Sequence, residues 1–161
     1  MINGYKCFNK NLINRYGKKF EVGKIYYVDG IIKFGNNGNG FHFCRNLEDT
    51  LRYFDVTNET EICQVRGFGK LVVYNDEYNG YYDMYAAEKI LVEKIMTREE
   101  IIDYALKLDN LRVVRFLMFY PLTREELNLF KEKFKNYINV LDAIKYYQEK
   151  DINVYKRRLV K

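Results

Sequence analysis

The stretch GNNGNGFHFCRNLEDTLRYF, residues 35–54, decides how the rest of the chain is interpreted. A loop rich in glycine and asparagine leads into a short apolar strand at residues 41–44, and an amphipathic helix follows at residues 46–54. The chain's only histidine, His42, lies in this strand two residues before Cys44. Side chains two residues apart on a strand point to the same face, so we expect His42 and Cys44 to share one face.

The helix predicted at residues 46–54 has one apolar and one charged face. Its leucines and its phenylalanine recur with helical spacing. The charged residues fall on the other face, and we expect Glu48, Asp49 and Arg52 to be exposed. An amphipathic helix buries its apolar face, so this one is expected to lie across a sheet.

Runs of aromatic and β-branched residues on both sides of this stretch predict that sheet. The expected strands are residues 5–8, 31–34, 41–44, 61–66 and 70–74, together with a two-stranded element over residues 19–28. Residues 89–95 could form a strand or a helix, and their short β-branched run favours a strand. The strands before residue 35 have the spacing of an antiparallel meander with a turn at Asp29-Gly30. Gly67-Phe68-Gly69 is expected to join the strands at 61–66 and 70–74.

At Met96 the pattern changes from strand to helix. The motifs at residues 97–100 and 123–126 both read Thr-Arg-Glu-Glu, a capping-box sequence that begins a helix. Residues 111–120 are apolar nearly all round and stop before Pro121, which predicts a buried central helix. Asn139 is expected to cap a last helix.

The predicted fold is therefore α+β, in two parts. Residues 1–95 form a strongly curved antiparallel sheet with one helix, and residues 96–161 form a bundle of three or four helices that packs on it. Two capped helical pairs are too few to stand as a solenoid of their own, which favours packing on the sheet.

Composition and charge bound the function. The chain has 16 Tyr and 11 Phe, and 30% of its residues are charged. Most of the net charge of +5 lies after residue 95 and includes a basic end with Lys156, Arg157 and Arg158. Such an end suits nucleic acid or an acidic protein, and a solvated terminus is the alternative interpretation.

The cysteines and the lone histidine give little support to catalysis. Cys7, Cys44 and Cys63 are odd in number and lack CxxC spacing, which favours buried thiols in a reducing compartment. A zinc site of these thiols with His42 is the alternative, but only one pair is close in sequence. The chain has no serine, which excludes a serine hydrolase. We expect neither a metal nor a cofactor, and the lack of a long apolar run predicts a cytoplasmic protein.

The first 95 residues resemble a small uncharacterised domain that recurs in bacteriophage and prophage genomes. The resemblance is carried by residues 4–10 (GYKCFNK), residues 20–26 (FEVGKIY) and residues 40–44 (GFHFC), with Leu47 and Tyr53 after them. It implies a phage or mobile-element origin, a place in the host cytoplasm and a role in host interaction. It brings no activity.

A second resemblance is to ADP-ribosyltransferases. Residues 38–43 (GNGFHF) are similar to their Gly-x-Gly-apolar-Tyr-Phe strand, with His42 in place of the usual tyrosine. This resemblance implies an NAD-dependent enzyme in which Lys6 stands where an arginine or histidine holds the cofactor. Glu77 and Glu88 are its candidates for the catalytic glutamate.

The leading functional hypothesis is a protein that acts without catalysis, by binding a host or phage macromolecule, most simply a protein. Tyrosine combines a large apolar ring with a polar hydroxyl and suits such interfaces. The candidate binding residues are His42, Tyr78, Tyr81, Tyr82, Lys156, Arg157 and Arg158. The ADP-ribosyltransferase-like enzyme is the alternative.

Overall fold

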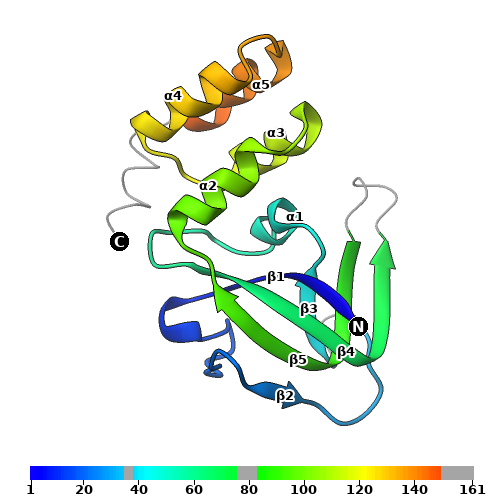
Figure 1. Cartoon of the computed structure of the whole chain (residues 1–161). Helices are drawn as coiled ribbons and strands as arrows, with labels where there is room; N and C mark the ends of the chain where they lie inside the picture. Colours follow the sequence, from blue (N-terminus) through cyan, green and yellow to red (C-terminus); the bar gives the residue numbers. More distant parts are fainter. Residues whose placement is uncertain (35–37, 76–82, 150–161) are drawn as a thin grey trace. The chain divides into compact units, whose positions relative to one another are not determined.

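Figure 1 shows a computed structural model of the chain, which describes residues 1–34, 38–75 and 83–149. The chain divides into two compact units. The first comprises Met1–Thr50 and Thr60–Met96, and the second comprises Leu51–Glu59 and Thr97–Lys161. An antiparallel sheet makes up most of the first unit and helices make up most of the second, so the predicted α+β class is confirmed.

The sheet of the first unit curls and closes on itself. Its strands in the described residues are β1 (Ile2–Phe8), β2 (Ile25–Tyr27), β3 (Phe41–Cys44), β4 (Glu61–Asn75) and β5 (Asp83–Ile95). β1 pairs with β3 and with β4, and β5 pairs with the same two strands, all antiparallel. This ring of pairs makes a small barrel. β2 is added to it by pairing with residues 89–91 of β5 (Figure 1).

The pairing differs from the predicted meander. β2 pairs with the distant strand β5, so that prediction is wrong. Residues 31–34 form no strand, and only an isolated bridge joins Lys33 to Asn39. The strands expected at 61–66 and 70–74 are one strand, β4, because the glycine at 69 takes a φ of 80° and produces a bulge rather than a turn.

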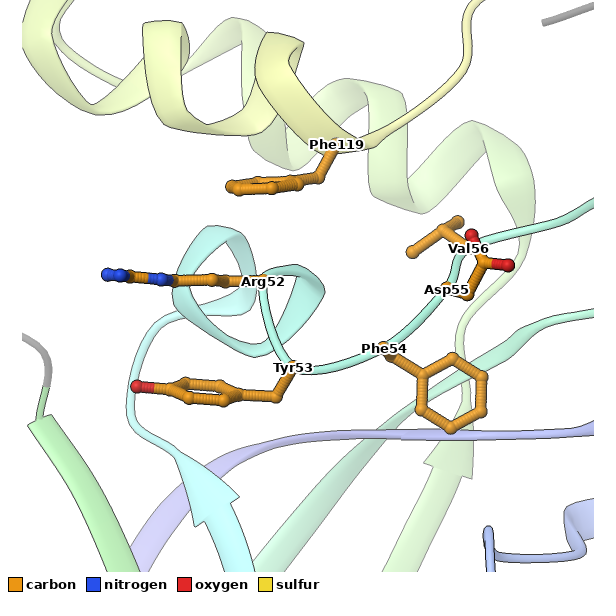
Figure 2. A pocket seen from close by; sticks show the side chains of 6 residues that line it. All are labelled: Arg52, Tyr53, Phe54, Asp55, Val56 and Phe119. Atoms are coloured by element: carbon orange, nitrogen blue, oxygen red, sulfur yellow. The ribbon is translucent and has the colours of Figure 1, made fainter. Parts of the chain in front are cut away.

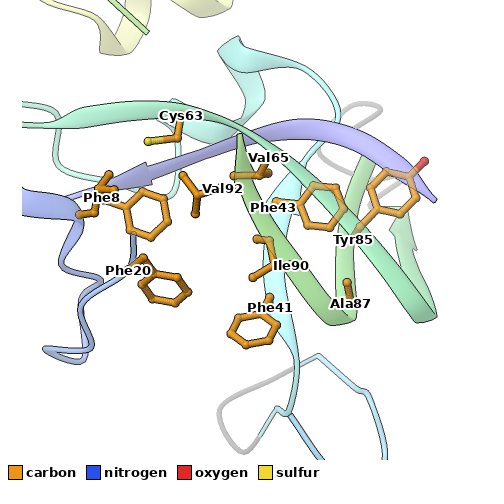
Figure 3. Packing of buried hydrophobic residues seen from close by; sticks show 11 residues of the cluster. Phe8, Phe20, Phe41, Phe43, Cys63, Val65, Tyr85, Ala87, Ile90 and Val92 are labelled. Carbon is orange, nitrogen blue, oxygen red and sulfur yellow. The ribbon is translucent and has the colours of Figure 1, made fainter. Parts of the chain in front are cut away.

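The barrel is filled by aromatic and β-branched side chains (Figure 3). Its buried residues are Phe8, Leu12, Phe20, Phe41, Phe43, Cys63, Val65, Tyr85, Ala87, Ile90 and Val92. Phe43 lies over two glycines of neighbouring strands. A Cβ added at Gly67 would come within 2.4 Å of its ring, and one added at Gly4 within 2.6 Å. Glycine is therefore required at both positions for the ring to fit.

The helix after β3 is shorter than expected and its acids are buried. α1 (Leu47–Leu51) has five residues, and Glu48 and Asp49 are each only 1% exposed, so the prediction that they face solvent is wrong. Asn46 donates from Nδ2 to Oδ2 of Asp49 at 3.0 Å. Buried carboxylates need such partners, which a helical periodicity does not reveal.

The second unit contains α2 (Arg98–Leu106), α3 (Asn110–Phe119), α4 (Arg124–Lys133), α5 (Ile138–Ala143) and the π-helical segment η2 (Ile144–Glu149). Phe116, Phe130 and Phe134 stack in its interior. α3 is not buried all round, because Leu111 is 71% exposed. Asn139 does not cap the last helix, since α5 begins after Tyr137. None of the described helices has the length and apolar character needed to cross a bilayer.

An ion pair joins the two Thr-Arg-Glu-Glu motifs of this unit. Arg98 Nε donates to Glu126 Oε1 at 2.6 Å, and its Nη2 donates to Oε2 at 2.8 Å. The full capping box forms at Thr123, whose backbone N–H donates to Glu126 at 2.8 Å. At Thr97 the side chain accepts from the backbone of Glu100. The repeated motif therefore both begins α2 and α4 and links their first turns.

We predict that Glu126→Gln lowers the free energy of unfolding by about 1–2 kcal/mol, because it weakens charged hydrogen bonds at a partly exposed pair. Burial opposes ionisation of Glu126, but the hydrogen bonds from Arg98 and Thr123 outweigh it and hold the pKa below its ordinary value of 4.5. The stabilisation is thus present above that pH and lost as the pH falls through the lower folded value. Denaturant titrations of both proteins across acid pH should converge, and a gap independent of pH would contradict this account.

Candidate functional site

His42 lies on the outer face of β3. Its neighbours Phe41 and Phe43 belong to the barrel interior, so the alternation of the strand turns the imidazole the other way. His42 is half-buried, whereas Cys44 on the same face is buried. The histidine is therefore placed where part of its ring meets solvent.

The imidazole begins a row of aromatic rings, which we call the aromatic surface: Phe34, His42 and Tyr74. The centroid of the Phe34 ring lies 5.0 Å from that of His42 and 5.5 Å from that of Tyr74. Tyr74 is 42% exposed and Phe34 is half-buried. The row brings together residues from the loop before β3, from β3 and from the end of β4.

The other predicted binding residues are not placed by the structure. The tyrosines Tyr78, Tyr81 and Tyr82 lie outside the described residues, and so do Lys156, Arg157 and Arg158. The aromatic surface does include Tyr74, one residue before the polar, tyrosine-rich stretch that begins at position 75. Sequence reasoning missed Phe34 and Tyr74. The one feature of the sequence that could have pointed to these two residues is that each is an aromatic residue at the end of a predicted strand.

The imidazole is held neutral near physiological pH. Burial lowers the pKa of His42 first, and the positive charges of Lys6 and Arg15 lower it further. A neutral ring can pack on an aromatic neighbour or accept a hydrogen bond without a charge to desolvate. This arrangement suits a contact surface.

We predict that His42 titrates below its ordinary value of 6.5 and that Lys6→Met raises its pKa, because a nearby positive charge is removed. Lys107→Met, an exposed lysine of the second unit, should leave the titration unchanged. Proton NMR of the imidazole across pH measures both. A folded pKa below 6.5 also means that protonation disfavours the fold, so stability should fall as the pH drops below that value.

Lys6 is a second unusual group in this unit. Its Nζ donates to the backbone carbonyl of His42 at 2.6 Å, close to the Tyr5–Cys44 register pair that joins β1 and β3. Burial lowers its pKa to about 8. The ammonium thus satisfies a strand carbonyl rather than a carboxylate.

Two positions that the ADP-ribosyltransferase resemblance implies, Lys6 and His42, are not brought to one face of the barrel wall. The Lys6 backbone pairs with Cys63, an interior residue, and His42 faces outward, so the two side chains leave the barrel wall on opposite faces. Glu88 accepts a hydrogen bond from the backbone N–H of Lys70 at the bulge of β4, at 3.2 Å. Glu77 lies outside the described residues.

The thiols are buried, as the sequence predicts. Burial raises the pKa of Cys44 and of Cys63 to about 12 and raises that of Cys7 as well, so all three are protonated at neutral pH. Cys63 belongs to the barrel interior, while Cys44 lies on the outer face of β3. Within the described ranges, no three histidine, cysteine or acidic side chains gather as a metal site.

The second unit has a pocket of its own, with a volume of about 360 Å³. It is lined by Arg52, Tyr53, Phe54, Asp55, Val56 and Phe119. Figure 2 shows the Arg52 side chain extended between the rings of Phe119 and Tyr53. Arg52 and Asp55 are exposed, while Val56 is buried.

Arginine between aromatic rings is a combination found at the energetic centres of protein interfaces. The guanidinium offers a planar fork for a carboxylate, and the rings offer apolar contact. The sequence predicted an exposed Arg52 but not this pocket, because Phe119 is 67 positions away in the chain. Only the tertiary structure brings Phe119 next to Arg52 and so reveals the pocket.

The comparisons with known proteins identify a family without an assigned activity. Residues 2–103 match the family described as Domain of unknown function (DUF7666). No curated protein matches the chain, and no solved structure does. The match covers the barrel and ends at residue 103, within α2, the first long helix of the second unit.

Proposed function

The chain belongs to the family described as Domain of unknown function (DUF7666), and we propose that it acts without catalysis, by binding another protein through its aromatic surface. The observation that carries the proposal is the continuous row of Phe34, His42 and Tyr74 on the outer face of the barrel. Aromatic side chains lose little conformational entropy on binding and bury a large area. The neutral imidazole adds a polar contact at low desolvation cost.

A protein partner fits this surface better than a nucleic acid. Binding to nucleic acid draws most of its affinity from lysine and arginine contacts with phosphates. The aromatic surface contains no lysine or arginine, and burial favours the neutral form of its histidine. Binding to nucleic acid would instead be recognised by an affinity that falls steeply as the salt concentration rises.

We further propose that the protein belongs to a phage or mobile element and that its partner is a host or phage protein in the host cytoplasm. The support is the resemblance of residues 4–10, 20–26 and 40–44 to a domain that recurs in such genomes. Two of these motifs contribute to the barrel. Gly4 leaves the space that the ring of Phe43 fills, and residues 41–44 form β3.

The experiment is affinity capture from a host lysate with four matched baits. These are the wild type, Phe34→Ala/Tyr74→Ala, a Tyr78, Tyr81, Tyr82 triple alanine variant, and the control Tyr16→Ala/Tyr137→Ala. The control removes two exposed tyrosines far from the aromatic surface in sequence. We expect one protein to be captured by the wild type and the control, and to be lost with Phe34→Ala/Tyr74→Ala. Equal capture by all four baits would remove the basis for the surface.

A further inference from the structure

Three aromatic rings converge on the side-chain ammonium of Lys18 in the first unit. Its Nζ lies 5.5 Å from the centroid of the Phe20 ring, 5.3 Å from that of Tyr26 and 5.3 Å from that of Phe41. Phe20 precedes β2, Tyr26 is in β2 and Phe41 begins β3. We call these three rings the aromatic cage. The cage is separate from the aromatic surface.

The rings are fixed by the barrel. Phe20 is 1% exposed and Phe41 is 8% exposed, and both belong to the interior cluster drawn in Figure 3. The Phe20 centroid lies 4.6 Å from that of Tyr26 and 6.1 Å from that of Phe41. A cage built from core residues is preorganised, because its members do not need to be ordered when a ligand enters.

The lysine in the cage differs from its neighbour Lys24. Lys24 pairs with Glu21 at 3.0 Å and also lies 5.5 Å from the Tyr26 ring. In the described part of the chain, Lys18 Nζ has no carboxylate partner and no hydrogen bond, so the ring faces are its only partners. Lys18 is itself exposed and lies just beyond the turn that contains Gly17. A long, exposed lysine side chain therefore lies against rings that the core holds in place.

We propose that the aromatic cage is a binding site for a quaternary ammonium group and that Lys18 is its internal occupant. Several aromatic faces around one cation are the arrangement that recognises choline and methylated lysine. A quaternary ammonium is weakly hydrated and gains more from ring faces than a primary ammonium does. The Tyr26 hydroxyl is buried and has no partner among the described residues, so a hydroxyl on the ligand would give it one.

Lys18 sets the apparent affinity of the cage. A site that an internal side chain fills for about nine-tenths of the time has its apparent affinity lowered about tenfold, because only the open fraction binds. Removing that side chain restores the full affinity. The proposal is independent of the function proposed above, since no residue of the aromatic surface takes part.

The test measures binding of choline to the full chain by NMR titration at constant ionic strength. We expect Lys18→Ala to bind choline about tenfold more tightly than the wild type, and Lys18→Ala/Tyr26→Leu to lose that gain. The neutral isostere 3,3-dimethyl-1-butanol should show no such gain, because it has the shape of choline without the charge. Lys33→Ala, which removes an exposed lysine of the first unit that contacts no ring of the cage, is the matched control and should bind as the wild type does.

Two results would overturn the proposal. One is equal affinity of the wild type and Lys18→Ala for choline, with both proteins folded by circular dichroism. The other is a gain of the same size for the neutral isostere, which would make the site merely apolar. Lys18→Gln keeps most of the length of the side chain and replaces the alanine variant in the test if that variant does not fold. A trimethyllysine peptide and its unmethylated form are titrated as a second arm. If the trimethyllysine peptide binds more tightly than choline does, the natural ligand is a methylated side chain of a protein.

Discussion

Replacing Phe43 by alanine is expected to lower the free energy of unfolding by about 3–5 kcal/mol, as removal of a buried aromatic ring does. The ring is 2% exposed and stacks on Tyr85 with centroids 5.5 Å apart. It also covers Gly4 and Gly67, whose missing side chains leave the space that it fills. No neighbour is placed to fill the cavity, because the strands around it are held by their ladders.

The same contact predicts a second, coupled result. Gly67→Ala alone should cost about 1–3 kcal/mol, since its new Cβ would lie within 2.5 Å of ring atoms of Phe43. In the Phe43→Ala background the same change should cost much less, because the methyl group then enters the cavity. Denaturant unfolding of the four proteins of this cycle measures the coupling. Additive effects would show that the ring does not pack on Gly67.

Replacing Gln148 by leucine is expected to lower the free energy of unfolding by about 3 kcal/mol, although the variant is more apolar and similar in volume. Gln148 is 4% exposed in η2. Its Nε2 donates to the carbonyls of Leu117 at 2.6 Å and Tyr120 at 2.8 Å, and its Oε1 accepts from the backbone N–H of Leu122 at 3.1 Å. The side-chain amide of Gln148 thus makes hydrogen bonds with three backbone groups where α3 ends. Leucine would leave two buried carbonyls and one buried N–H without this partner.

Lys145→Leu provides the matched control for this prediction. It places the same side chain three residues earlier, at an exposed position of η2, and should change stability by less than about 0.5 kcal/mol. Chemical denaturation followed by far-ultraviolet circular dichroism compares the two variants. A Gln148→Leu protein as stable as the wild type would mean that other groups satisfy the end of α3.

Several elements of this fold could be predicted because their signals are local. Thr97 and Thr123 start α2 and α4 where their capping sequences place them, and the alternation in residues 41–44 gives β3. The pairing of strands could not be predicted in the same way. β2 pairs with β5, at residues more than 60 positions away, and not with its neighbours in sequence. No turn motif in the sequence indicates this pairing.

The candidate site was predictable in part for the same reason. His42 was found because it is unique, and its outward direction follows from strand alternation. Phe34 and Tyr74 meet it only through tertiary structure. Glu48 and Asp49 were assigned to solvent because a helical pattern sorts residues by polarity, whereas burial with hydrogen-bonding partners can hold acids inside.

The claim that the molecule acts through the aromatic surface is tested most directly by calorimetric titration of the captured partner protein with the wild type, Tyr74→Ala and the control Tyr16→Ala. The account predicts that Tyr74→Ala weakens binding about tenfold or more, as loss of a central aromatic contact does, while Tyr16→Ala binds as the wild type does. The same dissociation constant for all three proteins would contradict it.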